Sequence, residues 1–164
     1  MGLDIRAYSS LSNPIDINYD ELSEDEQDYI CDNYINLYVN PDFPDHAKDV
    51  TSKFFKDGKE EVSFRAGSYS GYNIWRNWLA TIGGFKSDQD VWENFEQGPF
   101  VEMINFSDCE GVIGPAYCAK LYKDFVDYQH VVDSLPEDQD YNKQLYHEWK
   151  EAFRVGCTGA VQFC

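Results

Sequence analysis

The hydrophobic pattern changes its period between residues 62 and 84, and this change constrains the fold more than any other feature of the chain. Val62, Phe64 and Ala66 alternate with polar residues, which is typical of a β-strand with one buried face. The apolar residues that follow are spaced like one face of a helix, and they are Trp75, Trp78, Leu79 and Ile82. Gly83 and Gly84 then favour a helix C-terminus. The pattern predicts a strand that leads through a short loop into an amphipathic helix.

The same two patterns predict the other elements of the fold. Strands are expected where apolar residues alternate or form a short continuous run, at residues 3–7, 35–39, 100–106 and 160–163. Helices are expected at residues 23–31, 115–125 and 136–152, with a weaker one at 88–97. Together these elements predict a single α+β domain over residues 1–164. It would have a small, mostly antiparallel sheet of about five short strands and three or four helices.

Residues 41–61 interrupt this pattern with a polar stretch. Pro41, Pro44 and the pair Asp57-Gly58 favour turns. We therefore expect a surface excursion here, with a short helix around residues 46–55.

The overall charge excludes some classes of partner. The 164 residues include 30 Asp or Glu and 13 Lys or Arg, so the net charge is −17. Repulsion opposes direct binding to nucleic acid or to an anionic membrane, and no stretch approaches the ~18 apolar residues of a membrane span. The N-terminus lacks the basic region and following apolar run of a secretory signal, so a cytoplasmic protein is expected. The acidity suits a basic protein partner, or simply solubility, which is the commoner explanation.

The cysteines give no clear sign of a metal site or of disulfides. Their number is odd and no C-x-x-C pair occurs. A zinc site built from Cys109, Cys118, Cys157 and Cys164 is arithmetically possible, but its spacings are unlike those of zinc knuckles. Buried free thiols in a reducing compartment are the favoured interpretation. No metal is predicted, and the sequence names no cofactor.

A gap in the acidic charge marks the segment that is best suited to bind an anion. Residues 62–86 contain no Asp or Glu but keep Arg65, Arg76 and Lys86, whereas residues 1–61 and 87–164 each hold 15 acidic and five basic residues. The predicted helix N-terminus in this segment would add unpaired backbone N–H groups and a partial positive charge. The segment matches no standard phosphate-binding loop.

Eight residues are candidates for ligand binding, and each also has a structural interpretation. Arg65 and Arg76 would pair with an anion and Tyr69 and Tyr72 would stack on it. The candidates in this segment are Arg65, Ser68, Tyr69, Ser70, Tyr72 and Arg76, and the 107–111 loop adds Asp108 and Glu110. The two carboxylates would hold a hydroxyl, an amine or a divalent cation, or act as acid and base. Helix capping, core packing and turn formation are the structural alternatives.

Two stretches also resemble known sequences. They are FRAGSYSGYNIWRNWLA at 64–80 and INFSDCEGVIGPAYCAKLYKDF at 104–125, and the opening residues MGLDI add to the likeness. Together they resemble a group of small bacterial and phage proteins of unassigned activity. The resemblance covers the first residues and about the middle third of the chain. It implies a bacterial or phage cytosolic setting and supplies no activity, cofactor or catalytic residue.

Three functions fit these observations, and the acid-free segment favours the first of them. The first is binding of a small anionic or nucleotide-like ligand, with or without its hydrolysis, where the 65–76 and 107–111 loops converge. The second is an acidic interaction protein that mimics nucleic acid and blocks a basic host factor. The third is a homodimer whose interface is covered by part of the 16% aromatic residues.

Overall fold

The chain forms an α+β fold on one antiparallel sheet. The structure is a computed structural model that describes residues 2–164. The five strands lie in the order β2-β3-β1-β5-β4. They are β1 Gly2–Ile15, β2 Ile35–Asn36, β3 Phe54–Ser68, β4 Gly111–Ile113 and β5 Ala160–Phe163. Over the described residues the α-helices are α1 Glu24–Asn33, α2 Tyr69–Ile82, α3 Asp88–Asn94, α4 Val101–Ile104, α5 Pro115–Asp127, α6 Gln129–Asp133 and α7 Asp140–Gly156. The predicted fold class and antiparallel sheet are confirmed, with more helices than expected. None of the helices in the described part of the chain is both long and apolar enough to cross a membrane.

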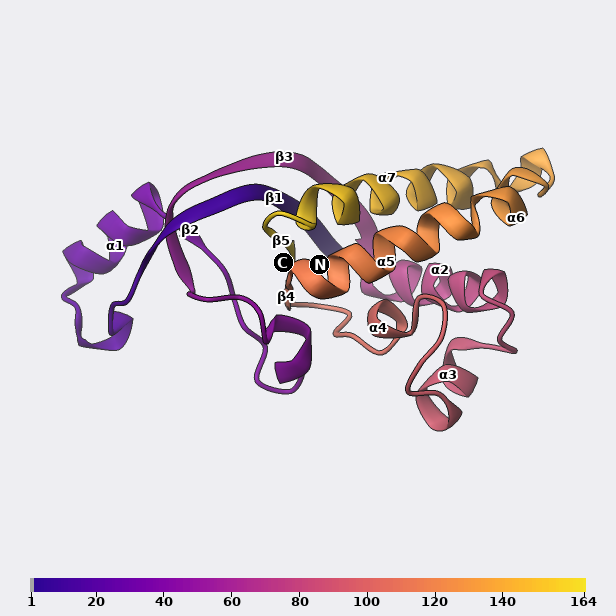
Figure 1. Cartoon of the computed structure of the whole chain (residues 1–164), viewed down its shortest axis with the longest axis horizontal. Helices are drawn as coiled ribbons and strands as arrows, with labels where there is room; N and C mark the ends of the chain where they lie inside the picture. The colour runs from indigo at the N-terminus through magenta and orange to yellow at the C-terminus, as the bar shows by residue number, and fades with distance from the viewer. Residues whose placement is uncertain (1) are drawn as a thin grey trace.

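β1 and β3 form a long curved ribbon that runs from near α1 to the start of α2 (Figure 1). They pair from Gly2 and Ser68 to Ile15 and Phe54, with register shifts at three points. Irregularities of this kind bend a strand and increase its twist. β5 pairs only with Ile5–Tyr8 of β1, so the far half of the ribbon extends beyond the rest of the sheet. This half carries α1 and β2 on the side of the molecule away from α2–α7 (Figure 1).

The two faces of the sheet belong to two hydrophobic clusters. Leu3, Ile5 and Ala7 lie in the larger cluster, together with buried residues of α2, α5 and α7. Successive strand residues point to opposite faces, so the smaller cluster covers the other side of the sheet. Its buried members are Tyr8, Leu37, Ala47, Phe55, Val112 and Ala160. The chain between β2 and β3 therefore closes the face that the helices leave open.

α2 confirms the helix predicted from the change in period. Trp75, Leu79 and Ile82 are buried in the larger cluster. The helix begins at Tyr69, and its N-cap is Ser68, whose Oγ accepts a hydrogen bond from the backbone N–H of Gly71 at 3.0 Å. α2 thus follows β3 without a separate loop, which fixes the first turn of the helix against the end of the strand.

The strand predicted at residues 100–106 is wrong, because these residues form the short helix α4 and the turns around it. Phe100 has a positive φ of 61°, and its backbone N–H donates to Oδ2 of Asp124 at 2.8 Å. Val101, Met103 and Ile104 are all buried. A short apolar run that is buried on every side gives the same sequence pattern in a strand and in a helical turn. The strand of this region is β4, at the end of the expected 107–111 loop.

Residues 41–61 also differ from the prediction. The short helix expected around residues 46–55 does not form, and the helical part is a 3₁₀ turn over Pro44–Ala47. β3 begins at Phe54, so residues 54–61 belong to the sheet rather than to a surface excursion. Phe54 and Phe55 are buried and pair with β2 and with the end of β1. Residues 56–61 are exposed on the ribbon, which explains their polar, turn-like sequence.

Candidate functional site

The predicted ligand-binding residues at the start of α2 serve mainly to build the helix. Ser68 caps the helix, and its Oγ lies 3.2 Å from Oγ of Ser70. Tyr69 is half-buried against the larger cluster, and Tyr72 is fully buried within it. The ring of Tyr72 is therefore not available to stack on a ligand from solvent. These four residues follow the capping and packing alternative.

Arg76 is a buried cation with neutral partners. It is 5% exposed, and its Nη1 donates to the Phe106 carbonyl at 2.8 Å while its Nη2 donates to Oδ1 of Asn73 at 2.6 Å. Its Cζ lies 4.9 Å from the ring centroid of Trp92 and 5.4 Å from that of Tyr72. No carboxylate of residues 2–164 lies within 4.0 Å of this guanidinium. Carbonyl, amide and ring electrons compensate the charge instead.

Asn73 joins the two predicted loops. Its Nδ2 donates to Oδ2 of Asp108 at 2.9 Å, so Arg76, Asn73 and Asp108 form one chain of hydrogen bonds. The loop that carries Asp108 is closed by Oγ of Ser107, which accepts from the backbone N–H groups of Cys109 and Glu110 at 3.3 and 3.2 Å. The predicted convergence of the 107–111 loop with α2 is therefore present. Asp108 contributes to it through Asn73, whereas Glu110 is exposed.

Arg65 does not join this network. It lies on β3 opposite Asp4 of β1, and its Nη1 is 3.6 Å from Oδ1 of that residue. Its side chain is 60% exposed, whereas Arg76 lies in the interior. The two arginines do not form one exposed cationic patch. Anion binding by this segment stays a prediction, and it would require an anion to displace partners that both guanidinium groups already have.

The Tyr72 hydroxyl provides a test of whether anything binds inside this network. It is buried without a hydrogen-bond partner, and burial raises the pKa of Tyr72 well above its usual value. Tyr72→Phe is expected to leave the free energy of unfolding unchanged or to raise it by up to about 1 kcal/mol, because a desolvated hydroxyl is removed. Urea unfolding of both proteins measures this difference. A loss above about 1 kcal/mol would show that the hydroxyl has a bound partner.

A dense acidic surface lies at the other end of the molecule. We call residues 16–32, which include all of α1 except its last residue Asn33, the acidic segment. It contains eight acidic residues and no basic one, and all eight are exposed: Asp16, Asp20, Glu21, Glu24, Asp25, Glu26, Asp28 and Asp32. Glu26 completes a capping box with Ser23 at the start of α1. Among residues 2–164 no basic side chain lies within 4.0 Å of any of these carboxylates.

An apolar groove lies within the acidic segment. Its volume is about 330 Å³, and its lining residues are Ile17, Leu22, Asp25, Glu26, Tyr29 and Ile30. Tyr29 is 59% exposed, although it lies on the same helix as the buried Ile30. We call this hollow the α1 groove. It combines apolar contact area with carboxylates on the same two turns of helix.

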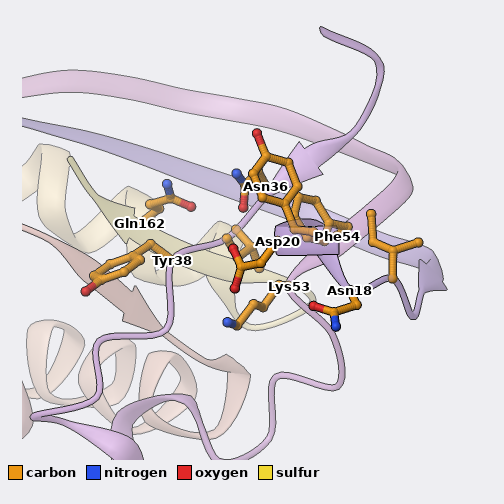
Figure 2. A pocket seen from close by; sticks show the side chains of 10 residues that line it. Asn18, Asp20, Asn36, Tyr38, Lys53, Phe54 and Gln162 are labelled. Atoms are coloured by element: carbon orange, nitrogen blue, oxygen red, sulfur yellow. The ribbon is translucent and has the colours of Figure 1, made fainter. Parts of the chain in front are cut away.

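A second hollow, of about 300 Å³, separates the acidic segment from the sheet. Its polar lining comes from Asn18, Asp20, Asn36, Tyr38, Lys53 and Gln162, and the apolar part comes from Ile17, Tyr19, Leu37 and Phe54. Figure 2 shows the side chains of its lining residues gathered around the hollow. We call it the polar pocket. Neither Arg65 nor Arg76 lines it or the α1 groove.

Cysteine and histidine side chains in the described part of the chain are not grouped as a metal centre. No group of three or more His, Cys, Asp or Glu in residues 2–164 is placed to hold a metal ion. All five cysteines are free thiols, but the expected burial is wrong for most of them, because only Cys118 is buried and Cys31, Cys109 and Cys164 are exposed. Burial raises the pKa of Cys118 well above its usual range, which suppresses the reactive thiolate. The ring of His46 packs against that of Phe106, with centroids 4.7 Å apart, and its Nε2 lies 2.7 Å from the Glu102 carbonyl oxygen. Burial lowers the pKa of His46.

Sequence reasoning did not single out the residues of the two hollows, although both leave a signal in the sequence. Residues 7–45 contain ten acidic residues and no Lys or Arg, a longer one-sided run of charge than the acid-free segment. Gln162 is a polar residue inside the short apolar strand Ala160–Phe163. A polar side chain at an alternate position of a buried strand is the signal for a group that faces a cavity.

No protein-family model, curated protein or solved structure matches this chain.

Proposed function

We propose that this protein binds a basic protein partner through the acidic segment and the α1 groove. The observation that carries the proposal is that an apolar groove and eight exposed, unpaired carboxylates occupy the same 17 residues. Charged surfaces steer a partner and select its sign, while apolar contacts hold the complex together. Tyr29, half exposed at the groove, is the type of residue that dominates binding energy at protein interfaces.

The distribution of charge favours this function over simple solubility. A chain that needs only solubility gains it from acidic and basic residues mixed over its surface. Here 8 of the 30 acidic residues lie within residues 16–32 without a basic residue between them. Repulsion among these carboxylates opposes the compact state, and a partner that brings positive charge relieves it. The position of α1, away from the helices α2–α7, leaves the segment accessible (Figure 1).

The partner surface that fits is basic and partly apolar. Lysine and arginine side chains would face the carboxylates, and one or two apolar side chains would enter the α1 groove beside Tyr29. A protein whose basic surface binds nucleic acid in other circumstances meets this description, so the protein would act as a nucleic-acid mimic toward it. In that case duplex DNA competes for the partner. A partner that DNA does not displace indicates an ordinary protein interface with the same chemistry.

The anion-binding alternative at residues 65–76 and 107–111 has less support. Arg76 is hydrogen-bonded to the Phe106 carbonyl and to Asn73, and Arg65 is paired with Asp4. An incoming anion would have to replace interactions that hold the chain together. Within residues 2–164 no basic side chain pairs with the acidic segment, and Glu26 alone among its carboxylates accepts hydrogen bonds, from the N–H and hydroxyl of Ser23.

Neutralising four of the eight carboxylates of the acidic segment is expected to weaken partner capture strongly. The variant carries Asp16→Asn, Glu21→Gln, Asp28→Asn and Asp32→Asn, which leaves the capping box of Ser23 and Glu26 intact. Recovery of basic proteins from a bacterial lysate on the immobilised variant should fall by about tenfold or more, because each lost charge pair contributes several tenths of a kcal/mol. Tyr29→Ala should weaken capture by a similar factor while retaining its dependence on salt. Quantitative mass spectrometry of the bound proteins measures both effects.

A control variant removes the same charge elsewhere. Glu60→Gln, Glu96→Gln, Glu137→Gln and Asp138→Asn neutralise four exposed carboxylates outside the acidic segment. This variant should capture the same proteins as the parent chain. Equal loss in both four-site variants would mean that capture follows net charge alone, and the proposed interface would be wrong.

A further inference from the structure

The polar pocket contains a polar side chain at a position where the fold calls for an apolar one. Gln162 lies on β5, with Arg6 of β1 and Val112 of β4 as its neighbours in the sheet. Val161 and Phe163 on either side of it point into the larger cluster, so Gln162 points to the other face. Ala160 and Val112 on that face are buried in the smaller cluster. An apolar residue at position 162 would extend this cluster.

The Gln162 amide has no hydrogen-bond partner among residues 2–164. Its Oε1 is buried and accepts no hydrogen bond from residues 2–164. A buried acceptor without a donor destabilises the folded state, and native proteins keep few of them without a reason. The terminal torsion of a glutamine side chain is broad, so its amide can turn to offer either the acceptor or the donor to the pocket. A bound molecule that supplies both a donor and an acceptor would satisfy it.

The other polar side chains that line the pocket also lack hydrogen-bond partners within residues 2–164. Within residues 2–164 the side chains of Asn18, Asp20, Asn36, Tyr38 and Lys53 form no hydrogen bond with the protein. Lys53 and Asp20 are not paired with each other within 4.0 Å. Figure 2 shows these groups arranged around the hollow together with Gln162. Three of them are amides, counting Gln162, and each amide offers one donor group beside one acceptor.

A rigid aromatic wall completes the pocket. Tyr19 stacks on Phe54 with ring centroids 5.5 Å apart and an interplanar angle of 19°. The hydroxyl of Tyr19 lies 3.1 Å from the sulfur of Cys31 on α1, which fixes the orientation of its ring. Tyr38 is 43% exposed and presents an aromatic surface to the same hollow. Flat apolar walls of this kind suit a planar ligand.

We infer that the polar pocket binds a nucleoside through its planar base. The edge of a nucleobase carries adjacent donors and acceptors that glutamine and asparagine amides match, and aromatic side chains stack on its face. The volume of about 300 Å³ lies at the lower limit of small-molecule sites, which suits a base with its sugar. Lys53 is the only cation in the lining, and Asp20 and the acidic segment lie beside it. The neutral nucleoside is therefore favoured over its phosphates. The inference does not rest on the proposed protein interface, although residues 17–20 of the acidic segment line the pocket and Ile17 also lines the α1 groove.

The experiment is a titration of the full chain with adenosine, guanosine, cytidine, uridine and thymidine, followed by NMR. At least one nucleoside should shift the side-chain amide resonances of Gln162 and Asn36 in a saturable way. The corresponding 5′-monophosphate should bind no tighter. If none of the five nucleosides shifts these resonances, the inference is wrong. Tighter binding of the monophosphate would overturn the preference for a neutral ligand.

Gln162→Leu separates binding from folding. The substitution keeps a similar volume and removes the unpaired amide, so the midpoint of thermal unfolding should stay the same or rise. Affinity for the nucleoside should fall by roughly tenfold or more, because the central donor and acceptor are lost. Gln144→Leu on the exposed surface of α7 is the matched control and should leave affinity unchanged. Equal affinity of the Gln162→Leu variant and the parent chain would show that Gln162 is an unsatisfied core residue and nothing more. Asn36→Ala provides a second variant and should also weaken binding.

Discussion

Trp149→Ala is expected to lower the free energy of unfolding by about 3–5 kcal/mol, the usual range when a large buried aromatic side chain is truncated. Trp149 lies on α7, is fully buried, and joins elements that are distant in the sequence. Its ring centroid is 5.2–6.0 Å from those of Phe64, Tyr72, Trp75, Phe153 and Phe163. These five rings come from β3, α2, α7 and β5. Truncation therefore leaves a cavity where the sheet and two helices meet.

Trp149→Phe is the control for this prediction. The indole Nε1 of Trp149 is buried and has no hydrogen-bond partner in residues 2–164. Phenylalanine fills part of the cavity and also removes the unsatisfied donor, so it should cost about 1–2 kcal/mol. Urea unfolding monitored by far-UV circular dichroism measures both variants. If Trp149→Ala does not fold, the Phe variant still tests the prediction. A cost for Trp149→Phe as large as that expected for Ala would mean that the indole N–H has a partner.

The helix faces that pack around Trp149, on α2 and α7, are also the part of the fold that the sequence predicted best. Trp75 and Leu79 of the predicted α2 face are buried, and on α7, within the helix predicted at 136–152, Leu145 and Trp149 follow the same helical spacing and are buried. Strong periodicity over several turns identifies a helix face whatever packs on it, because the geometry of the helix alone sets the spacing. The alternation of Leu3, Ile5 and Ala7 identified β1 for the same reason. Tyr141 is the exception, since it lies in the first turn of α7 and is 67% exposed.

The elements that the sequence did not predict depend on contacts between distant segments. The apolar run at residues 100–106 is buried on every side, and a fully buried segment loses the alternation that separates strand from helix. Residues 56–61 of β3 are polar because they pair with β1 on one side only and are exposed to solvent. No local pattern reports the strand order, because the pairing of β1 with β5 joins the two ends of the chain. Asp4 and Cys164 exchange backbone hydrogen bonds of 2.7 and 2.9 Å at this junction.

In the candidate sites, too, features within one segment could be seen in the sequence, whereas contacts between distant segments could not. The lack of carboxylates over residues 62–86 is visible in the sequence, but it can have two causes that a sequence cannot separate. A segment that binds anions excludes carboxylates, and so does a segment that becomes a buried helix face with a compensated arginine inside. Asn73 and the Phe106 carbonyl, which compensate Arg76, were not predictable because one of them is a backbone group 30 residues away. The polar pocket combines residues from the acidic segment, β2, β3 and β5, and only the fold brings them together.

Arg76→Leu is expected to lower the free energy of unfolding by about 2–4 kcal/mol, and Arg65→Ala by less than about 1 kcal/mol. The Leu side chain would leave the Phe106 carbonyl and Oδ1 of Asn73 without their donors, at 2.8 and 2.6 Å in the parent chain. Asn73, whose amide donates to Asp108, would then no longer be oriented by its hydrogen bond from Arg76. The Arg65 side chain is 60% exposed, and its pair with Asp4 is an ordinary surface ion pair. For a domain of this size the thermal midpoint of Arg76→Leu should fall by roughly 4–16 °C.

These two variants decide what the acid-free segment is for. If the segment is a scaffold, the variants differ in stability as predicted and neither changes the recovery of a bound small molecule. If the segment binds an anion, Arg65→Ala removes a ligand contact at little cost in stability, so a co-purifying anion detected by native mass spectrometry is lost from a protein that still melts normally.

Arg76→Lys tests whether the position requires the positive charge or the hydrogen-bond geometry. It keeps the positive charge but lacks the planar fork that reaches both Phe106 and Asn73, so a purely structural role predicts destabilisation despite the retained charge. Normal stability of Arg76→Lys would show that charge, rather than this hydrogen-bond geometry, is what the position requires.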